Sequence, residues 1–218
     1  MEVRVLMVDD HPPIIEGYKA MLSNHTKPFK FNVLPAYSSE SAYDSIVNSP
    51  DEYDIITLDI TMPAYVEKKI NSGTDLIPFI RKHKPKSKII IITSHFESLV
   101  LFKVQKECYP EGIMVKSDFI KTELANAFES VLDGETHYSK TVLDLKSEMA
   151  ITATHLDIYC RQMIILLNQG IQTKNLPEHL NLSKSAVDKR KVIIKEYFNI
   201  EKGNDEDILR EARKRGMI

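Results

Sequence analysis

Five residues with chemically useful side chains each stand at the end of a short apolar run: Asp9, Asp10, Asp59, Thr93 and Lys116. In an open parallel sheet, ligands bind outside the carboxyl ends of the strands, so these residues converge if the runs are neighbouring strands. A carboxylate at the tip of a buried strand is costly unless it has partners. We therefore interpret the five residues as one site.

Three carboxylates and one lysine in a crevice suit chemistry at a phosphoryl group. Oxygen ligands from Asp10 and Asp59, with Asp9 acting through water, fit a Mg²⁺ ion that keeps several waters. The metal and Lys116 would neutralise phosphoryl charge, which leaves Asp59 as the nucleophile. The hydroxyl of Thr93 would bond a phosphoryl oxygen.

Strands and helices alternate over about the first 130 residues. The apolar runs predict strands at 3–8, 31–37, 55–58, 88–93 and 112–115, and the segments between predict helices from Pro12, from 38 or 39 to Val47, and over about 75–83, 98–107 and 121–132. This alternation predicts a doubly wound α/β fold with a five-stranded parallel sheet.

The chain from Leu156 onward carries helical patterns and no strand signal. Helices are predicted at Asp157–Asn168, Thr173–Leu180, Lys184–Phe198 and about Asp205–Lys214, with a three-residue turn before the third. Two helices joined by so short a turn, the second cationic, have the form of a helix-turn-helix. We expect domains at 1–134 and 151–218, joined by a polar connection at 135–150.

The predicted helix from Lys184 is amphipathic at 100° per residue. Its apolar side includes Val187, Ile193 and Ile194, together with Arg190, whose stem would pack while its head reaches a phosphate or an acidic partner. The outer side would meet DNA phosphates and bases, unless it is only a solvated face. The residues of that outer side are Lys184, Ser185, Asp188, Lys189, Lys191 and Lys195.

Composition excludes several classes of protein. The chain of 218 residues has a net charge of −2 and an ordinary share of apolar residues, so a sizeable core can form. Residues 150–218 carry 12 Lys and Arg against 9 Asp and Glu, whereas the preceding residues carry 17 against 22. No apolar run could span a bilayer, the start of the chain reads as a strand rather than a signal peptide, and two distant cysteines argue against disulfides and zinc. We expect a cytoplasmic protein.

Residues 1–134 resemble a response-regulator receiver domain, which has a flavodoxin-like fold. The resemblance rests on Val8–Pro12, Glu16-Gly17, Leu58–Pro63, Thr93 and Lys116, and the Asp-Asp-His-Pro opening is similar to the NarL/LuxR type. It implies that a sensor histidine kinase phosphorylates Asp59. The resemblance also assigns a Mg²⁺ site to Asp9, Asp10, Asp59 and the backbone carbonyl of Thr61, a switch hydroxyl to Thr93 and phosphate pairing to Lys116.

The C-terminal segment resembles a LuxR-type output domain, through Leu166–Gly170, Leu180–Ser183 and Val187. Together the two resemblances imply a two-component transcriptional regulator that binds double-stranded promoter DNA, acts as a homodimer when active, has no membrane partner and is not a metabolic enzyme.

Four departures from these families keep alternatives open. Ile113 replaces the aromatic that often accompanies the switch threonine, and the loop Ala64–Ser72 is unusually long. This loop is either a surface insertion or a contact that tunes kinase choice or phosphate lifetime. Asp157-Ile158 replaces a Thr-Pro pair, and Asp188 replaces a lysine that contacts phosphate.

Two rival functions therefore remain. One is a receiver-containing adaptor whose output domain binds protein, and the other is a small phosphatase with Asp59 as its nucleophile. His11 is interpreted as part of the entry to the first helix rather than as a base or metal ligand, and His95 receives no role.

Overall fold

The computed structural model describes residues 1–23, 29–95, 97–119, 122–152 and 156–218. The chain divides into two compact units. The first comprises residues up to His95 together with Val104–Leu143, and the second comprises Asp144–Ile218 together with the start of a helix that ends at Cys108. Among the described residues, no helix is both long enough and apolar enough to cross a membrane.

A parallel six-stranded sheet forms the centre of the first unit, in the order β2-β1-β3-β4-β5-β6. Strand pairing aligns Val8 of β1 with Leu58 of β3, and Thr93 of β4 with Val115 of β5. The central strands consist almost entirely of buried apolar residues, as expected for a sheet covered on both faces. The bounds are β1 Glu2–Val8, β2 Lys30–Ala36, β3 Ile55–Leu58, β4 Lys88–Thr93, β5 Gly112–Val115 and β6 His137–Tyr138.

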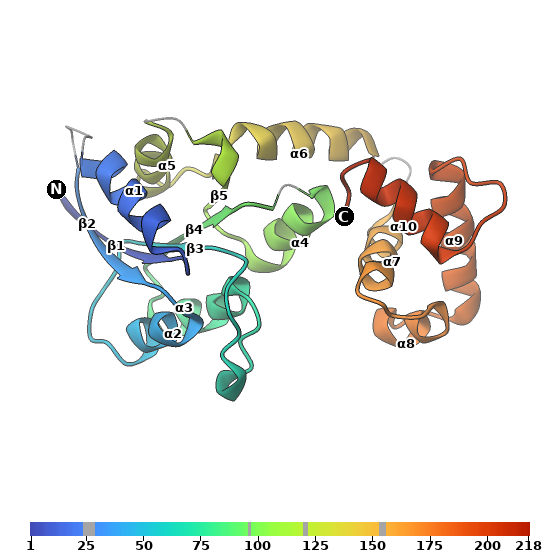
Figure 1. Cartoon of the computed structure of the whole chain (residues 1–218), viewed down its shortest axis with the longest axis horizontal. Helices are drawn as coiled ribbons and strands as arrows, with labels where there is room; N and C mark the ends of the chain where they lie inside the picture. The colour runs from blue at the N-terminus through green and yellow to red at the C-terminus, as the bar shows by residue number, and fades with distance from the viewer. Residues whose placement is uncertain (24–28, 96, 120–121, 153–155) are drawn as a thin grey trace. The chain divides into compact units, whose positions relative to one another are not determined.

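Helices cover both faces of this sheet. Helices α1 (Pro12–Ser23) and α5 (Glu123–Leu132) pack together on one face, whereas α2 (Ser39–Val47) and α3 (Ile77–His83) pack together on the other (Figure 1). Phe128 of α5 lies wholly buried in the core on the first face. The unit also contains the end of α4 (Ser98–Cys108) and three short 3-10 helices: η1 Val66–Lys68, η2 Gly73–Leu76 and η3 Lys116–Asp118.

The doubly wound parallel α/β fold predicted from the sequence is confirmed, with one strand added. The short strand β6 pairs with β5 and was not predicted, because two residues are too few to produce a strand pattern. It precedes α6 (Lys140–Thr152), so the predicted polar connection contains regular structure. Lys121, where the sequence predicted the start of the fifth helix, lies outside the described residues.

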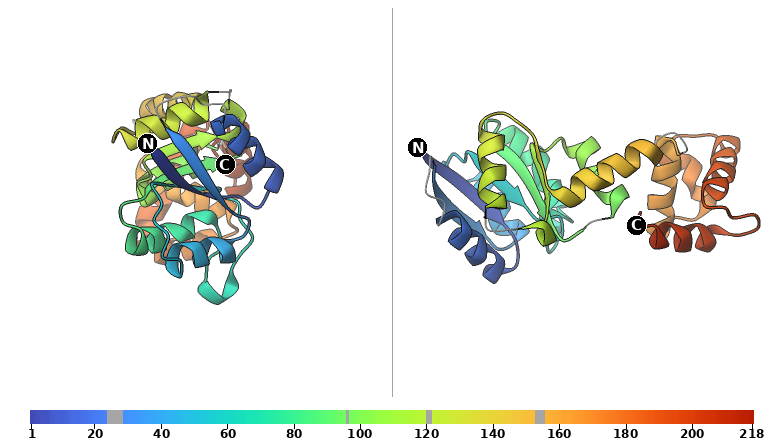
Figure 2. Two further views of the ribbon diagram at one scale, coloured as in Figure 1. Left: turned by 90° about the vertical axis from the view of Figure 1, so that its left-hand side faces the viewer. Right: turned by 90° about the horizontal axis from the view of Figure 1, so that it is seen from above.

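The second unit contains the four predicted C-terminal helical segments. They are α7 (Ile158–Asn168), η4 (Thr173–Asn175) with α8 (Leu176–Leu180), α9 (Lys184–Tyr197) and α10 (Asp205–Lys214). Their apolar sides share one buried cluster that includes Met163, Ile194 and Ile208. Figure 2 shows this helical unit from two further directions.

Candidate functional site

The strand ends bring the predicted site residues together. Asp9 and Asp10 follow β1, Asp59 follows the neighbouring strand β3, Thr93 ends β4 and Lys116 follows β5. Asp9 and Asp59 are each 4% exposed, and Thr93 is fully buried. These positions follow from parallel register alone, since carboxyl ends of adjacent parallel strands meet at one edge of the sheet.

Lys116 bridges the two buried carboxylates. Its Nζ lies 2.6 Å from Oδ2 of Asp9 and 2.6 Å from Oδ2 of Asp59, and donates a hydrogen bond to each. Burial alone would lower the pKa of Lys116, but the hydrogen bonds to Asp59 and Asp9 outweigh it and raise that pKa. The lysine is therefore a stable cation held between two acids, positioned to neutralise any charge added to Asp59.

The loop after β3 holds Asp59 by close backbone contacts. The amide of Asp59 donates to the carbonyl of Val8, and the amide of Thr61 donates to Oδ1 of Asp59 at 3.2 Å. A Cβ placed on Gly73 would lie 1.8 Å from the carbonyl oxygen of Asp59. Only glycine fits there, so Gly73 fixes the path of the loop that returns past the carboxylate.

The pair Asp9–Asp10 has a donor set suited to a hard cation. Among the described residues, Asp9, Asp10 and His11 place possible ligand atoms within 4.8 Å of one another. Oδ1 of Asp10 is buried and makes no hydrogen bond with any described residue, although Nδ1 of His11 lies 2.8 Å away. A buried acceptor without a donor is costly unless a cation or water satisfies it, so these residues fit Mg²⁺. The exposed imidazole of His11 is at the rim of this group.

Thr93 and His95 bring a second layer of polar groups to the site. The amide of His95 donates to Oγ1 of Thr93 at 3.0 Å. A hydroxyl that accepts one hydrogen bond still carries its own proton as a donor. The ring Nε2 of His95 lies 2.9 Å from Oγ1 of Thr61. His95, to which the sequence analysis assigned no role, therefore borders the site. The sequence signal for this position was its spacing of two residues from Thr93.

The unusual loop Ala64–Ser72 is folded as a small hairpin. Tyr65 and Ile70 form an antiparallel bridge, and Lys69 takes a left-handed conformation with φ of 57°. Tyr65 and Lys68 pack against α2, because the rings of Tyr65 and Tyr43 meet edge to face at 5.9 Å and the ammonium of Lys68 lies 5.2 Å from the ring centre of Tyr43. Ile70 is fully buried. Contacts with α2 and the burial of Ile70 thus hold the loop in place.

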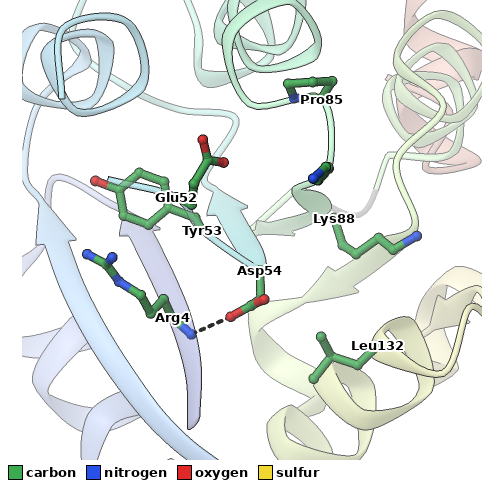
Figure 3. A pocket seen from close by; sticks show the side chains of 8 residues that line it. Arg4, Glu52, Tyr53, Asp54, Pro85, Lys88 and Leu132 are labelled. Atoms are coloured by element: carbon green, nitrogen blue, oxygen red, sulfur yellow. Dashed lines mark hydrogen bonds between the residues drawn. The ribbon is translucent and has the colours of Figure 1, made fainter. Parts of the chain in front are cut away.

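A separate pocket of about 560 Å³ opens at the opposite, amino-terminal ends of the strands (Figure 3). Charges of both signs line it, and the amide of Arg4 donates to Oδ2 of Asp54 at 2.7 Å. The pocket contains none of the predicted site residues. Its lining is Arg4, Glu52, Tyr53, Asp54, Pro85, Lys86, Lys88 and Leu132.

The predicted helix-turn-helix has well-formed caps in the second unit. Helix α8 ends at Asn181, which has a left-handed φ of 53°, and α9 begins after Ser183, whose hydroxyl accepts from the amide of Ala186. Both caps suit a tight turn between helices. Val187 and Ile194 are buried as predicted, whereas Ile193 is 39% exposed although its position on the wheel predicted a buried face.

The predicted DNA-contacting residues of α9 fall into two groups. Lys184, Ser185, Asp188 and Lys189 are exposed. The other three donate to partners within the second unit. Arg190 donates to Oδ2 of Asp157 at 2.9 Å, Lys191 pairs with Asp205 and donates to Oγ1 of Thr173, and Lys195 donates to the carbonyl of Gly203 at 2.7 Å.

The Arg190 pair explains one departure from the family pattern. Asp157 caps α7 by accepting from the amide of Cys160 at 2.7 Å, and its other oxygen holds Arg190. The guanidinium also lies 4.8 Å from the ring centre of Tyr159. The acidic partner that the sequence offered for Arg190, as one of two possibilities, is therefore Asp157.

Asp118, two residues after Lys116, has a structural role that the sequence analysis did not predict. Its carboxylate accepts hydrogen bonds from Ser139 and Thr141 at the start of α6. The contacting residues are more than 20 positions apart in the chain. The sequence signals were weak: an acid two residues after Lys116, and Ser139 and Thr141 at the start of a weak helical pattern.

Comparison with known proteins places this geometry in a family. Residues 5–116 match the response regulator receiver domain. The transcriptional regulatory protein MctR of Rhizobium johnstonii is 22% identical over 202 residues, which cover 91% of this chain and 88% of MctR.

Solved structures extend the likeness to the helical unit. A LuxR-family two-component response regulator from Aurantimonas sp. SI85-9A1 is 26% identical, with a TM-score of 0.57, over 69% of this chain and 99% of that chain. A structure of two RcsB dimers bound to two parallel DNAs is 22% identical, with a TM-score of 0.66, over 98% of each chain. The latter likeness shows the fold of both units.

Proposed function

This chain belongs to the response regulator receiver family, and from that premise we propose that it is a phosphorylation-switched, DNA-binding transcriptional regulator. The observation that carries the proposal is Lys116 bridging Asp9 and Asp59 beside the hydroxyl of Thr93. We further propose a receiver domain at 1–134, a connection at 135–150 and an output domain at 151–218.

The site supports transfer of a phosphoryl group to Asp59. A carboxylate oxygen of Asp59 attacks the phosphorus of a phosphohistidine on a sensor kinase. The P–N bond breaks as the new P–O bond forms, and the departing imidazole nitrogen keeps the electron pair and later takes a proton. Lys116 neutralises the added charge, and the hydroxyl of Thr93 donates to a phosphoryl oxygen.

Mg²⁺ is the cofactor that the acidic residues fit. Asp9, Asp10, Asp59 and the backbone carbonyl of Thr61 would hold it, and the orphaned Oδ1 of Asp10 supports this assignment. When bound, the ion would neutralise charge on the phosphoryl oxygens. The chain's own residues orient the acceptor: Gly73 lets the loop pass close to Asp59, and the amide of Thr61 holds Oδ1.

The output region supports a DNA-binding role. Lys184, Ser185, Asp188 and Lys189 present an exposed face on the second helix of a helix-turn-helix, where lysines would neutralise phosphates and short polar side chains would reach base edges. Arg190, Lys191 and Lys195 would reach DNA only by exchanging their internal partners. MctR is a transcriptional regulatory protein, and RcsB binds DNA as dimers, which favours promoter DNA and a homodimer for this chain. We also propose that the protein is cytoplasmic.

A protein-binding adaptor is the second candidate, because two observations favour it. Three of the seven proposed DNA-contacting residues are engaged internally, and Asp188 presents a carboxylate on the exposed face. A carboxylate repels DNA unless it accepts from a cytosine amino group. Promoter DNA that shifts in a salt-dependent manner with the full chain supports transcription, whereas no binding even at low salt supports the adaptor.

A phosphatase is the third candidate, and its products distinguish it. It would turn over phosphomonoesters repeatedly, whereas a receiver holds one stable adduct on Asp59. Repeated release of inorganic phosphate from a phosphomonoester would therefore support the phosphatase, whereas one phosphoryl group retained per chain supports the receiver.

The proposal is tested with the full chain, as wild type and Asp59→Asn, each with and without Mg²⁺ and beryllofluoride, which imitates a phosphoryl group on a carboxylate. Mass and promoter-DNA affinity should change only for wild type with the analogue, with a gain in affinity of roughly 5- to 150-fold. The exposed variant Asp133→Asn should behave as wild type. Identical behaviour in all four conditions would contradict the phosphorylation switch.

A further inference from the structure

Asp118 joins the short helix that carries Lys116 to the start of α6. One carboxylate oxygen of Asp118 accepts from the hydroxyl of Ser139 at 2.6 Å and from the amide of Thr141 at 2.8 Å, and the other accepts from the hydroxyl of Thr141 at 2.7 Å. The amide of Thr141 belongs to the first turn of α6, where backbone N–H groups lack helical partners. Asp118 therefore caps α6 from a distant part of the chain.

Ser139 ties this cap to the sheet. It is fully buried; its amide donates to the carbonyl of Ile113, and its hydroxyl oxygen accepts from the amide of Val115 at 3.0 Å. Both partners belong to β5, the strand that ends immediately before Lys116. We call the hydrogen-bonded set Asp118–Ser139–Thr141 the α6 clamp.

The charge of Asp118 is stabilised within the clamp. Burial alone would raise the pKa of Asp118, but the hydrogen bonds from Ser139 and Thr141 lower it below its ordinary value. A carboxylate near the N-terminus of a helix also interacts favourably with the helix dipole. The clamp is thus held by an ionised group at neutral pH.

The clamp and the phosphorylation site share one turn of backbone. Helix η3 contains only Lys116–Asp118, so Lys116 and Asp118 stand at its two ends. Lys116 now contacts the carboxylates of Asp9 and Asp59 together. A phosphoryl group on Asp59 occupies the space around that carboxylate and offers new oxygens to the ammonium, so Lys116 must move with it.

The aromatic route of signalling is absent at its usual position. Ile113 is buried on β5. It has no aromatic ring that could move between a buried and an exposed position. The clamp is attached to the carbonyl of this same residue through Ser139.

From this geometry we propose that Asp118 is a positioning residue that couples the placement of Lys116 over Asp59 to the conformation of the first turn of α6. The coupling is reciprocal by thermodynamic linkage: a phosphoryl group alters the clamp, and the clamp alters the affinity of the site for a phosphoryl group. The inference rests on the proposed phosphorylation of Asp59.

The test measures two quantities in the full chain with Mg²⁺: beryllofluoride affinity, and amide hydrogen exchange at Thr141–Leu143 with and without the analogue. In wild type, the analogue should change exchange at these amides by roughly 5-fold or more. Asp118→Ala should abolish that response and lower beryllofluoride affinity by roughly 5-fold or more. Asp144→Ala, which removes an exposed carboxylate from α6 outside the clamp, is the matched control and should keep both properties.

Two milder variants keep the test decisive if Asp118→Ala fails to fold. Thr141→Val removes one hydrogen bond and should weaken the response, and Asp118→Asn keeps one acceptor oxygen and should restore part of what alanine loses. A purely structural cap would loosen α6 in these variants without altering beryllofluoride affinity, and that result would overturn the coupling. An undiminished response in all clamp variants would overturn it too.

The test separates this inference from the proposed function. If wild type does not bind beryllofluoride, both are wrong. If wild type binds it but α6 responds independently of Asp118, only the coupling is wrong.

Discussion

The receiver site and the face of α9 use the same residue types in opposite ways. In the receiver site, the side chain of Lys116 is 13% exposed and lies between two buried acids, and strands place all three groups. On α9, Lys184 and Lys189 are exposed, whereas neighbouring cations are paired within the fold. A buried charge needs an oppositely charged or hydrogen-bonding partner, so its position is fixed. An exposed lysine pairs weakly and can contact several different neighbours.

The largest effect is expected from a backbone change in the receiver site. Gly73→Ala would place a Cβ 1.8 Å from the carbonyl oxygen of Asp59, so the loop must move and the beryllofluoride adduct should be lost. Gly17→Ala in α1 is the control, because nothing lies within 4 Å of its added Cβ. There, alanine should stabilise the helix by about 1 kcal/mol. Equal adduct formation by the two variants would show that Gly73 does not shape the site.

The second effect tests the matched burial of charges. Lys116→Ala leaves Asp9 and Asp59 buried without their shared cation, which should lower the free energy of opening around β1 and β3 by about 3 kcal/mol. Amide hydrogen exchange in the presence of a chelator measures this region separately from the helical unit. Added Mg²⁺ should restore part of the loss. Substitution of the exposed Lys86 by alanine should cause no comparable change. If Lys116→Ala has the same free energy of opening as wild type, the proposed role of the bridge is wrong.

The third effect tests the division of the α9 cations. Lys184→Ala and Lys189→Ala should each reduce the slope of log affinity against log salt by about 0.9, since each removes one phosphate contact. Lys191→Ala should leave the slope unchanged and weaken the packing of α9 on Asp205. Salt titrations of promoter binding by the full chain distinguish these cases. A smaller slope for Lys191→Ala would mean that this lysine leaves Asp205 on DNA.

The sequence predicted which residues meet at the strand ends, because sheet topology constrains their positions. A residue directly after a parallel strand lies at the carboxyl edge of the sheet. The sequence alone therefore predicts that Asp9, Asp59 and Lys116 lie close together. The fold class followed from the same alternation of strands and helices.

The remaining contacts depend on geometry that local patterns do not carry. Arg190 could reach a phosphate or an acid with equal ease, and only the fold places Asp157 beside it. The clamp of Asp118 joins residues more than 20 positions apart in the chain, and Ile193 is exposed although the helical wheel places it on the apolar side. Long side chains and tertiary caps are therefore the parts that sequence reasoning missed.

The smallest predicted effect is the pH dependence of the second unit. Burial would raise the pKa of Asp205, but hydrogen bonds from Lys191 and Thr173 lower it below its ordinary value of 3.8. A lowered folded-state pKa stabilises the fold above about pH 4 and loses that contribution as pH falls through the folded value. Asp205→Asn should therefore be less stable than wild type at pH 7, and the difference should disappear in acid. Thermal unfolding of the full chain from pH 7 to pH 3 measures it, and a constant difference would contradict the assignment.

The claim that Asp59 accepts the phosphoryl group has one direct measurement. The full chain is phosphorylated with a small-molecule phosphodonor and Mg²⁺, reduced with borohydride, which converts an aspartyl phosphate to homoserine, and mapped by peptide mass spectrometry. The account predicts homoserine at position 59 alone, and none there in Asp59→Asn. Homoserine at position 9 or 10 instead, or the absence of any modification, would contradict it.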